Sequence, residues 1–217
     1  MRTNQDYKNA ALAALKGNWP QAIVATFLVL VLDALLDAVV YFGSEYSTVA
    51  VIAVSVLLMF FLVLPLLLGY INSFSLMFYR SDREVLLNVK DIAFRDYFMG
   101  SVGMMVMILV SSVCSLLLVV PGIIASYALF LTPYILKDNP ELSIMETLRL
   151  SRKMMEGHKM QLFKLQLSFL GWILLSVLTL GVGLLWLMPY MMTAMAAFYQ
   201  DVREQYIMKE GQQESAL

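Results

Sequence analysis

Charged residues are scarce in this chain. Asp, Glu, Lys and Arg together account for 14% of its 217 residues, whereas they account for about 25% of an average soluble domain. Hydrophobic residues account for 60%, and the mean hydropathy is +0.75. Because a soluble domain needs a more polar surface, this composition excludes an ordinary globular protein and indicates an integral membrane protein.

Cysteine, histidine and net charge are also low. The chain has one cysteine, Cys114, and one histidine, His158, so it can form neither an internal disulfide nor a Cys/His metal cluster by itself. The net charge of -1 lacks the basic excess that is typical of nucleic-acid-binding proteins. We therefore expect no metal, no cofactor and no nucleic-acid partner.

Two long segments contain no Asp, Glu, Lys or Arg: Tyr97 to Leu136 and Leu165 to Gln200. As single helices they would extend roughly 60 and 54 Å, which is about twice the hydrocarbon thickness of a bilayer. Each segment is therefore predicted to be a hairpin of two membrane-spanning helices. The predicted turns are at Val120-Pro121-Gly122 and between Thr179 and Gly183, where proline or glycine interrupts the apolar sequence.

The N-terminal third has a similar organisation. A first span is predicted from Trp19 to Tyr41, followed by a polar turn at residues 43–47. A second uncharged segment extends from Ser47 to Tyr79 and contains Pro65 near its middle. Since proline either kinks a helix or ends it, this segment is either one kinked span or a tight hairpin of two short helices.

The positions of the basic residues favour the single kinked span. With that alternative, all 15 Lys and Arg residues lie on one side of the membrane, which the positive-inside tendency identifies as the cytoplasm. The predicted fold class is an all-α integral membrane protein with six transmembrane helices in three hairpins and both termini in the cytoplasm. Residues 1–217 are predicted to form a single membrane domain, with hairpin units at about 1–80, 81–137 and 138–201 and a cytoplasmic tail at 202–217.

Each hairpin is preceded by a segment predicted to form a cytoplasmic amphipathic helix in the plane of the membrane. The first segment has an apolar face made of Tyr7, Ala11, Leu12 and Leu15. The polar stretch before the first apolar span is long for a signal peptide, which argues against cleavage. The third begins with Ser143 and Glu146 in the spacing of a capping box. The three segments are Thr3 to Lys16, Glu84 to Arg95 and Ser143 to Glu156.

The C-terminal half carries a set of glycine, proline and aromatic motifs. They include Pro121-Gly122-Ile123, Asp138-Asn139-Pro140, Gly157-His158-Lys159, Leu180-Gly181-Val182-Gly183 and Phe198-Tyr199-Gln200-Asp201. On these motifs the chain resembles the bacterial multi-pass membrane family called domain of unknown function 975, which looks distantly similar to the membrane domain of some glycerophosphodiester phosphodiesterases. The resemblance implies a multi-pass protein of the bacterial cytoplasmic (inner) membrane, and it implies no reaction.

Two carboxylates lie inside the first predicted span. Asp33 and Asp37 are four residues apart and share one helix face, roughly 21 and 27 Å from Trp19 along the helix axis. One interpretation is that they reach a small water-filled outer mouth or bond to nearby hydroxyls. The other is that they form a proton or cation site, or bind a cationic ligand.

Basic residues cluster around the third amphipathic segment. They are predicted to form a cytoplasmic face that attracts anionic lipid or docks a partner protein. His158 is interpreted first as a turn residue hydrogen-bonded to backbone, with acid-base chemistry or phosphate binding as the alternative. The candidate face consists of Arg149, Arg152, Lys153, His158, Lys159 and Lys164.

Three classes of function fit these features. A non-enzymatic module that binds membrane lipids or a partner protein is favoured, because no catalytic constellation is found. A small transporter or transporter subunit with a site near Asp33 and Asp37 is the alternative, and an intramembrane lipid enzyme comes third. A homo-oligomer is compatible with all three classes. Asn72 is expected to join helices through hydrogen bonds.

Overall fold

The computed structural model describes residues 3–43, 48–80, 85, 88–89, 97–117 and 119–214. Within these ranges the chain is helical and contains no strand, which agrees with the predicted all-α class. In chain order, the elements are α1 (Asn4–Leu15), α2 (Trp19–Gly43), α3 (Thr48–Leu58), a π-helical turn η1 (Met59–Val63), α4 (Leu64–Arg80), α6 (Tyr97–Leu117), α7 (Val119–Ala128), α8 (Thr132–Asp138), α9 (Ile144–Met154), α10 (Lys159–Leu167), α11 (Leu170–Leu178) and α12 (Leu184–Glu214).

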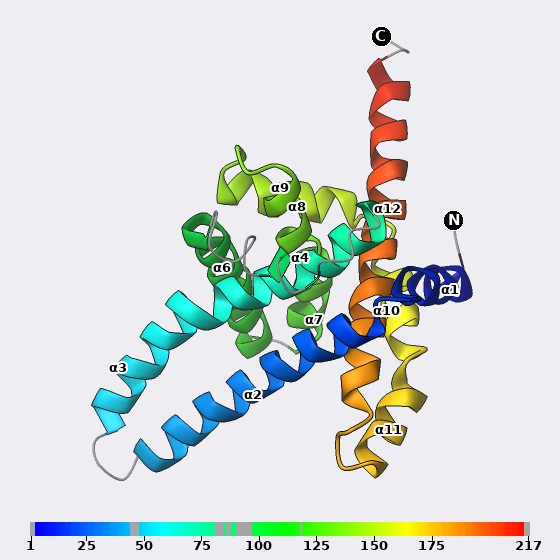
Figure 1. Cartoon of the computed structure of the whole chain (residues 1–217). Helices are drawn as coiled ribbons and strands as arrows, with labels where there is room; N and C mark the ends of the chain where they lie inside the picture. Colours follow the sequence, from blue (N-terminus) through cyan, green and yellow to red (C-terminus); the bar gives the residue numbers. More distant parts are fainter. Residues whose placement is uncertain are drawn as a thin grey trace.

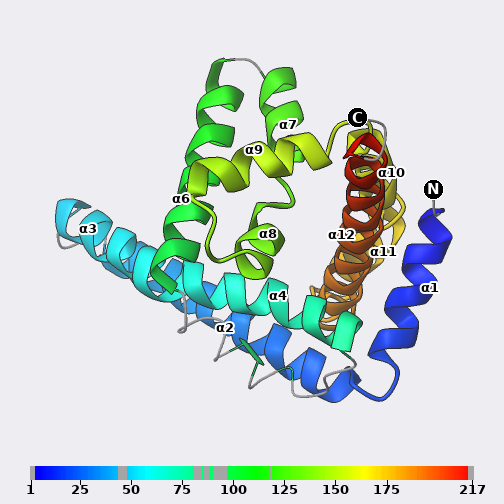
Figure 2. The same cartoon turned by 90° about the horizontal axis from the view of Figure 1, so that it is seen from above.

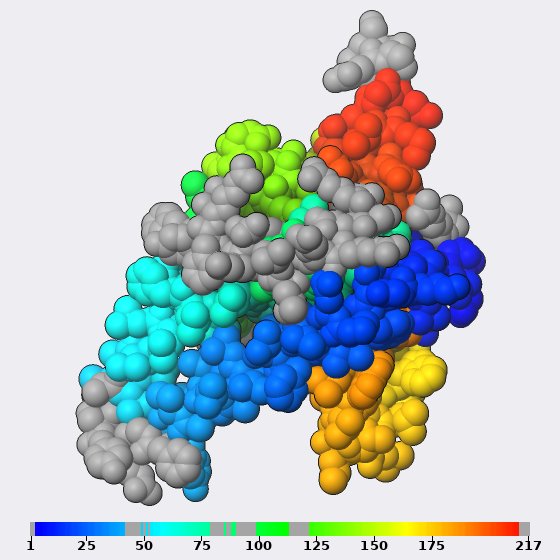
Figure 3. Space-filling model, viewed as in Figure 1, coloured from blue at the N-terminus to red at the C-terminus, as the bar shows by residue number. Residues whose placement is uncertain are grey.

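Three helical hairpins dominate the arrangement. Helix α2 pairs with α3 and α4, α6 pairs with α7, and α11 pairs with α12 (Figure 1). The hairpins diverge from one another: the turned view shows α6 and α7 leading away from α2 and α4 (Figure 2). In the space-filling view, the α2–α3 and α11–α12 hairpins project separately from the rest of the molecule (Figure 3).

Within the described ranges, three helical segments are long and apolar enough to cross a membrane. They are Trp19–Tyr41, Ala53–Phe78 and Lys159–Leu178, while the apolar part of α6, Met99–Ser112, is shorter. The chain therefore has the character of a membrane protein. The structure supports half of the six spans that the sequence predicts, and the complete set stays a prediction.

Pro65 lies within a continuous helix and does not reverse the chain. Helices α3 and α4 are joined through η1 without a break, so residues 48–80 form one rod. The Leu64 N–H bonds to the Met59 carbonyl, five residues back, directly before the proline. A proline removes one backbone donor and crowds the preceding turn, and a widened π turn relieves that crowding. The helix continues through Pro65, as the single-span alternative predicts, and the tight hairpin is excluded.

The largest core surrounds α12 and α1 and takes further buried side chains from α8, α9 and α10. Tyr7 and Ala11 of α1 are fully buried against a run of small and aromatic side chains on α12, including Ala194, Ala197 and Phe198. The small side chains let the two helices approach closely. The apolar face of α1 is thus covered by protein, whereas the sequence assigns it to the membrane surface; Leu12 alone of its four predicted members is exposed.

The α11–α12 turn has the predicted position and needs its glycines. Leu180 and Gly181 have φ values of 53° and 87°, a left-handed conformation that glycine adopts without steric cost. A Cβ on Gly183 would lie 2.7 Å from the Ser176 Oγ and 3.0 Å from the Ser176 Cα. Glycine therefore lets the ends of α11 and α12 touch.

The other predicted local features have different outcomes. The capping box of α9 is confirmed, because the Ser143 side chain and the Glu146 side chain each accept from the other residue's backbone N–H. The predicted turn at residues 120–122 is wrong, since α7 already begins at Val119. Proline is tolerated in the first turn of a helix, so Pro121 does not require a loop. The predicted helix over 84–95 lies mostly outside the described residues.

Candidate functional site

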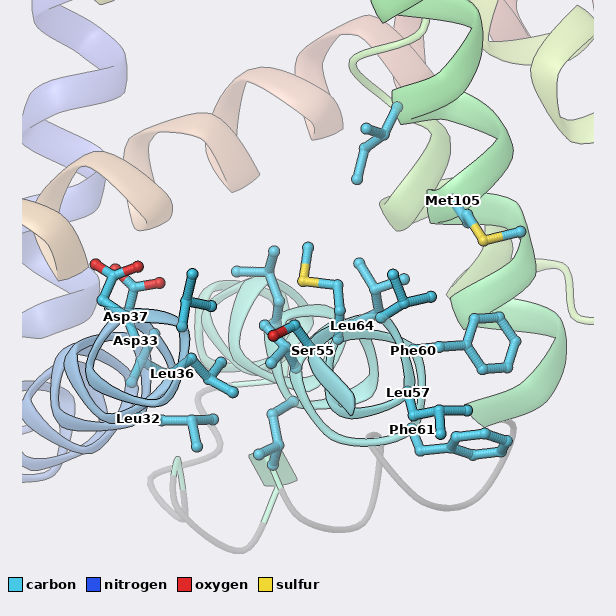
Figure 4. Close-up of a pocket in the computed structure, with 18 of the residues that line it drawn as sticks. Leu32, Asp33, Leu36, Asp37, Ser55, Leu57, Phe60, Phe61, Leu64 and Met105 are labelled. Atoms are coloured by element: carbon cyan, nitrogen blue, oxygen red, sulfur yellow. The ribbon is translucent and has the colours of Figure 1, made fainter. Parts of the chain in front are cut away.

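A pocket with a volume of about 820 Å³ lies between the α2–α4 hairpin and α6, and Met188 of α12 also lines it. Asp33 and Asp37 lie side by side at one edge of this pocket (Figure 4). Both are exposed residues of α2, one helical turn apart. The structure therefore places the predicted polar site at the edge of a cavity between helices.

The rest of the lining is almost entirely apolar. Phe60 and Phe61 of η1 pack edge to face with their ring centroids 5.1 Å apart, and Met105 of α6 lies on the side away from the carboxylates (Figure 4). Ser55 supplies one hydroxyl, whose oxygen is buried without a hydrogen-bond partner. The pocket thus combines a long hydrocarbon wall with two acidic groups at one edge.

Electrostatics make the acidic edge attractive to a cation. Two carboxylates four residues apart on a helix repel each other when both are ionised. The described residues that line the pocket include no Lys, Arg or His to offset that repulsion. The described residues also contain no group of three or more His, Cys, Asp or Glu that could hold a metal ion.

His158 belongs to a different, buried polar chain. It is 4% exposed, and its Nδ1 lies 3.3 Å from the Gln161 Oε1. The Gln161 Nε2 donates to the Tyr7 hydroxyl oxygen at 2.7 Å, and the Tyr7 hydroxyl donates to the Asp201 Oδ2 at 2.5 Å. Hydrogen bonds through Gln161 and Tyr7 therefore connect His158 to Asp201 of α12. Unlike the exposed basic residues, His158 is buried.

The basic residues are divided between two helices. Arg149, Arg152 and Lys153 are exposed on α9, and Lys164 is exposed on α10, where Lys159 is half-buried. Lys153 bonds to Glu210 of α12 at 3.0 Å. Hydrogen bonds to the Tyr206 hydroxyl and to Glu210 raise the pKa of Lys153, and hydrogen bonds from Tyr206 and Lys153 lower the pKa of Glu210.

Asn72 forms the predicted connection between helices. Its Nδ2 donates to the Leu68 carbonyl within α4 and to the Pro133 carbonyl of α8, each at 3.1 Å. A buried amide in this position holds α4 against α8. Cys114 lies in a part of α6 whose side chains are outside the description.

Several contacts across the fold were not anticipated from the sequence. Besides the Tyr7–Asp201 bond, Tyr199 donates to the Asp138 Oδ2 at 2.8 Å, and Arg203 lies 3.5 Å from the same oxygen. Tyr199 also stacks on Tyr134 with a centroid distance of 5.0 Å. The motifs around Asp138 and Tyr199 were visible in the sequence, but nothing local indicated that they meet.

Comparison with known proteins identifies the family. Residues 91–206, which are more than half of the chain, match the family described as Protein of unknown function (DUF975), and the chain belongs to that family. No curated protein and no solved structure matches the chain. The predicted similarity to the membrane domain of glycerophosphodiester phosphodiesterases is therefore not shown.

Proposed function

We propose that this member of the DUF975 family is a non-enzymatic, multi-pass protein of the bacterial cytoplasmic membrane that binds a membrane amphiphile between its helices. The observation that carries the proposal is the pocket of about 820 Å³ between the α2–α4 hairpin and α6, whose lining is almost wholly apolar. This volume lies within the range of roughly 300–1,000 Å³ that is usual for small-molecule sites.

The membrane assignment rests on exposed apolar surface. Large hydrophobic side chains are exposed along α2, such as Phe27, Leu28 and Leu35, and along α11, such as Leu174 and Val177. Contiguous apolar surface of this kind is unfavourable in water and suits contact with lipid chains. In the proposed topology, the three hairpins supply six spans, and both termini face the cytoplasm with the basic segments.

A lipid chain is the ligand that this pocket suits best. Hydrocarbon is the surrounding solvent of a membrane protein, so it can enter between the helices by lateral movement. Inside the pocket it would contact side chains such as Leu64, Phe60 and Met105. Packing and dispersion, rather than reaction chemistry, are what such a wall provides. The exposed Arg149 and Arg152 on α9 would add attraction to anionic headgroups or to a partner protein at the cytoplasmic surface.

Native mass spectrometry of the purified protein tests this proposal. After the detergent has removed loosely held lipid, the wild type is expected to retain one amphiphile per chain. The double variant Met105→Trp/Ile108→Trp places two large rings at the pocket wall and should lose that ligand. A matched control, Leu174→Trp/Val177→Trp, has the same spacing on an exposed face of α11. Equal retention by both variants would contradict the proposal.

A second candidate function is that of a small transporter or transporter subunit. The observation that favours it is that Asp33 and Asp37 both border the pocket, because intramembrane carboxylates mark ion and proton pathways in many transporters. Proteoliposomes loaded with a pH-sensitive dye provide the test. This candidate requires a flux that the Asp33→Asn/Asp37→Asn variant lacks; equal flux from both proteins would reject it.

A further inference from the structure

We propose that the pocket selects cationic amphiphiles: an alkylammonium head bound by Asp33 and Asp37, with its single alkyl chain lying along the apolar wall towards Met105. This inference rests on the proposed function and adds the chemical class of the ligand. It joins two features of one cavity, the pair of carboxylates at its edge and the hydrocarbon surface that continues from them.

The head assignment follows from charge complementarity. The two carboxylates lie next to each other at the edge of the pocket, and they are the charged groups among the residues that line it (Figure 4). An ammonium group placed between them would relieve their mutual repulsion. It would also donate charge-assisted hydrogen bonds, which are stronger than neutral ones. A phosphate headgroup would instead meet two negative charges.

An organic cation fits better than a metal ion. Divalent cations such as Ca²⁺ take six to eight oxygen ligands and Mg²⁺ takes six, whereas this edge offers the oxygens of Asp33 and Asp37 beside apolar side chains. A simple ion bound by the carboxylates would leave the apolar part of the cavity unfilled. An ammonium group linked to an alkyl chain satisfies the carboxylates and fills the cavity with the same molecule.

The path of the tail is also defined by named residues. Leu36, Ser55 and Leu64 lie between the carboxylates and the far side of the pocket, where Met105 and Phe60 are found (Figure 4). A chain laid along this path contacts aliphatic side chains first and aromatic side chains last. A polar tail would leave its hydrogen-bonding groups unpaired against this wall, at a cost that an alkyl chain avoids.

Equilibrium dialysis with charge-matched probes tests the inference. The full chain in phosphatidylcholine nanodiscs would be dialysed against dodecylammonium, 1-dodecanol and dodecyl sulfate, each below its critical micelle concentration where it has one, with empty nanodiscs subtracted. The proteins compared are the wild type, Asp33→Asn/Asp37→Asn and the control Glu141→Gln/Glu156→Gln. The control removes two exposed carboxylates outside the pocket.

The wild type and the control are expected to bind dodecylammonium about tenfold or more tightly than 1-dodecanol, and dodecyl sulfate most weakly. The Asn variant should bind dodecylammonium no better than 1-dodecanol, while its unchanged affinity for 1-dodecanol shows that the pocket is intact. If the wild type binds all three probes saturably and with equal affinity, the selection for cationic amphiphiles is wrong. The proposal that the pocket binds an amphiphile then still holds. Absence of saturable binding would overturn both, and a disulfide-linked dimer formed by Met105→Cys in a Cys114→Ser background would then identify a second copy of the chain as the occupant.

Discussion

The Tyr7 hydroxyl donates a hydrogen bond of 2.5 Å to the Asp201 carboxylate across 194 residues of sequence. Both side chains are buried, at 0% and 7% exposed. The bond fastens α1, near the N-terminus, to the middle of α12, where the rings of Tyr7 and Phe198 also meet edge to face at 5.7 Å. Helix α1 is therefore an integral part of the core.

Removing this hydroxyl should loosen α1. The Tyr7→Phe variant keeps the ring and removes the donor to a buried carboxylate, so we expect a loss of about 1.5–3 kcal/mol in the free energy of unfolding. Chemical unfolding in detergent would measure it. The Tyr206→Phe variant is the control, because its hydroxyl bonds to the more exposed Glu210 and should matter less. Equal effects of the two variants would contradict a special role for the Tyr7–Asp201 bond.

The α11–α12 hairpin should be sensitive to a single methyl group. In Gly183→Ala, the new Cβ would lie 3.0 Å from the backbone of Ser176, so the two helix ends must separate, at a cost of about 1–3 kcal/mol. Gly171→Ala is the matched control, because nothing lies within 4 Å of its added Cβ. Alanine favours the helix there, so the control should be neutral or slightly stabilising. Thermal unfolding of both variants compares them directly; a Gly183→Ala variant as stable as the control would show that the contact is not tight.

The contact between α9 and the end of α12 should depend on pH. Hydrogen bonds from Tyr206 and Lys153 lower the pKa of Glu210 below its ordinary value of 4.5. A lowered folded-state pKa means that the contact is complete above pH 4.5 and is lost as the pH falls through the lower value. A fluorophore attached at Met208→Cys in a Cys114→Ser background should measure the loss of this contact. Its fluorescence anisotropy should fall because the end of α12 becomes more mobile. Glu210→Gln should lower the anisotropy at neutral pH, whereas Lys209→Gln should leave it unchanged; a wild-type signal that does not change on acidification would contradict the assignment.

Labelling with an impermeant thiol reagent tests the proposed topology. The labelled protein carries Cys114→Ser and is expressed in intact cells. Cysteines at Val49 and Val182, beside the α2–α3 and α11–α12 turns, should react with the reagent from outside. Cysteines at Glu156 and Gln212 should be protected until the cells are opened. All four positions are exposed on the protein surface, so reactivity reports the side of the membrane rather than burial. External labelling at Glu156 would overturn the placement of the basic segments in the cytoplasm.

Local features of the fold could be predicted from the sequence. The spacing of charges predicted the α11–α12 hairpin, and Ser143 with Glu146 predicted the start of α9, because each depends on residues close together in the chain. The start of α7 was misplaced, since a proline such as Pro121 suits a turn and the first turn of a helix equally well. The face of α1 was assigned to lipid, because an apolar stripe has the same pattern whether lipid or protein covers it.

The site could be predicted only in part. Asp33 and Asp37 stood out as charges within an apolar span, but the pocket beside them depends on how α2, α4 and α6 pack. No local pattern encodes a space between helices that are distant in sequence. The same applies to Tyr7 and Asp201, whose residue types carry no signal of their pairing.

Photo-cross-linking determines whether the interhelical pocket holds an amphiphile. The probe is an alkyl amphiphile with a diazirine at the end of its chain, added to the protein in nanodiscs and mapped by mass spectrometry of the labelled peptides. We expect labels on Phe60, Met105 and Ile108, which line the pocket, and the loss of these labels when excess unlabelled amphiphile competes. Labels that fall instead on exposed residues of α11 such as Val177 and Leu178, without competition, would contradict binding in the pocket.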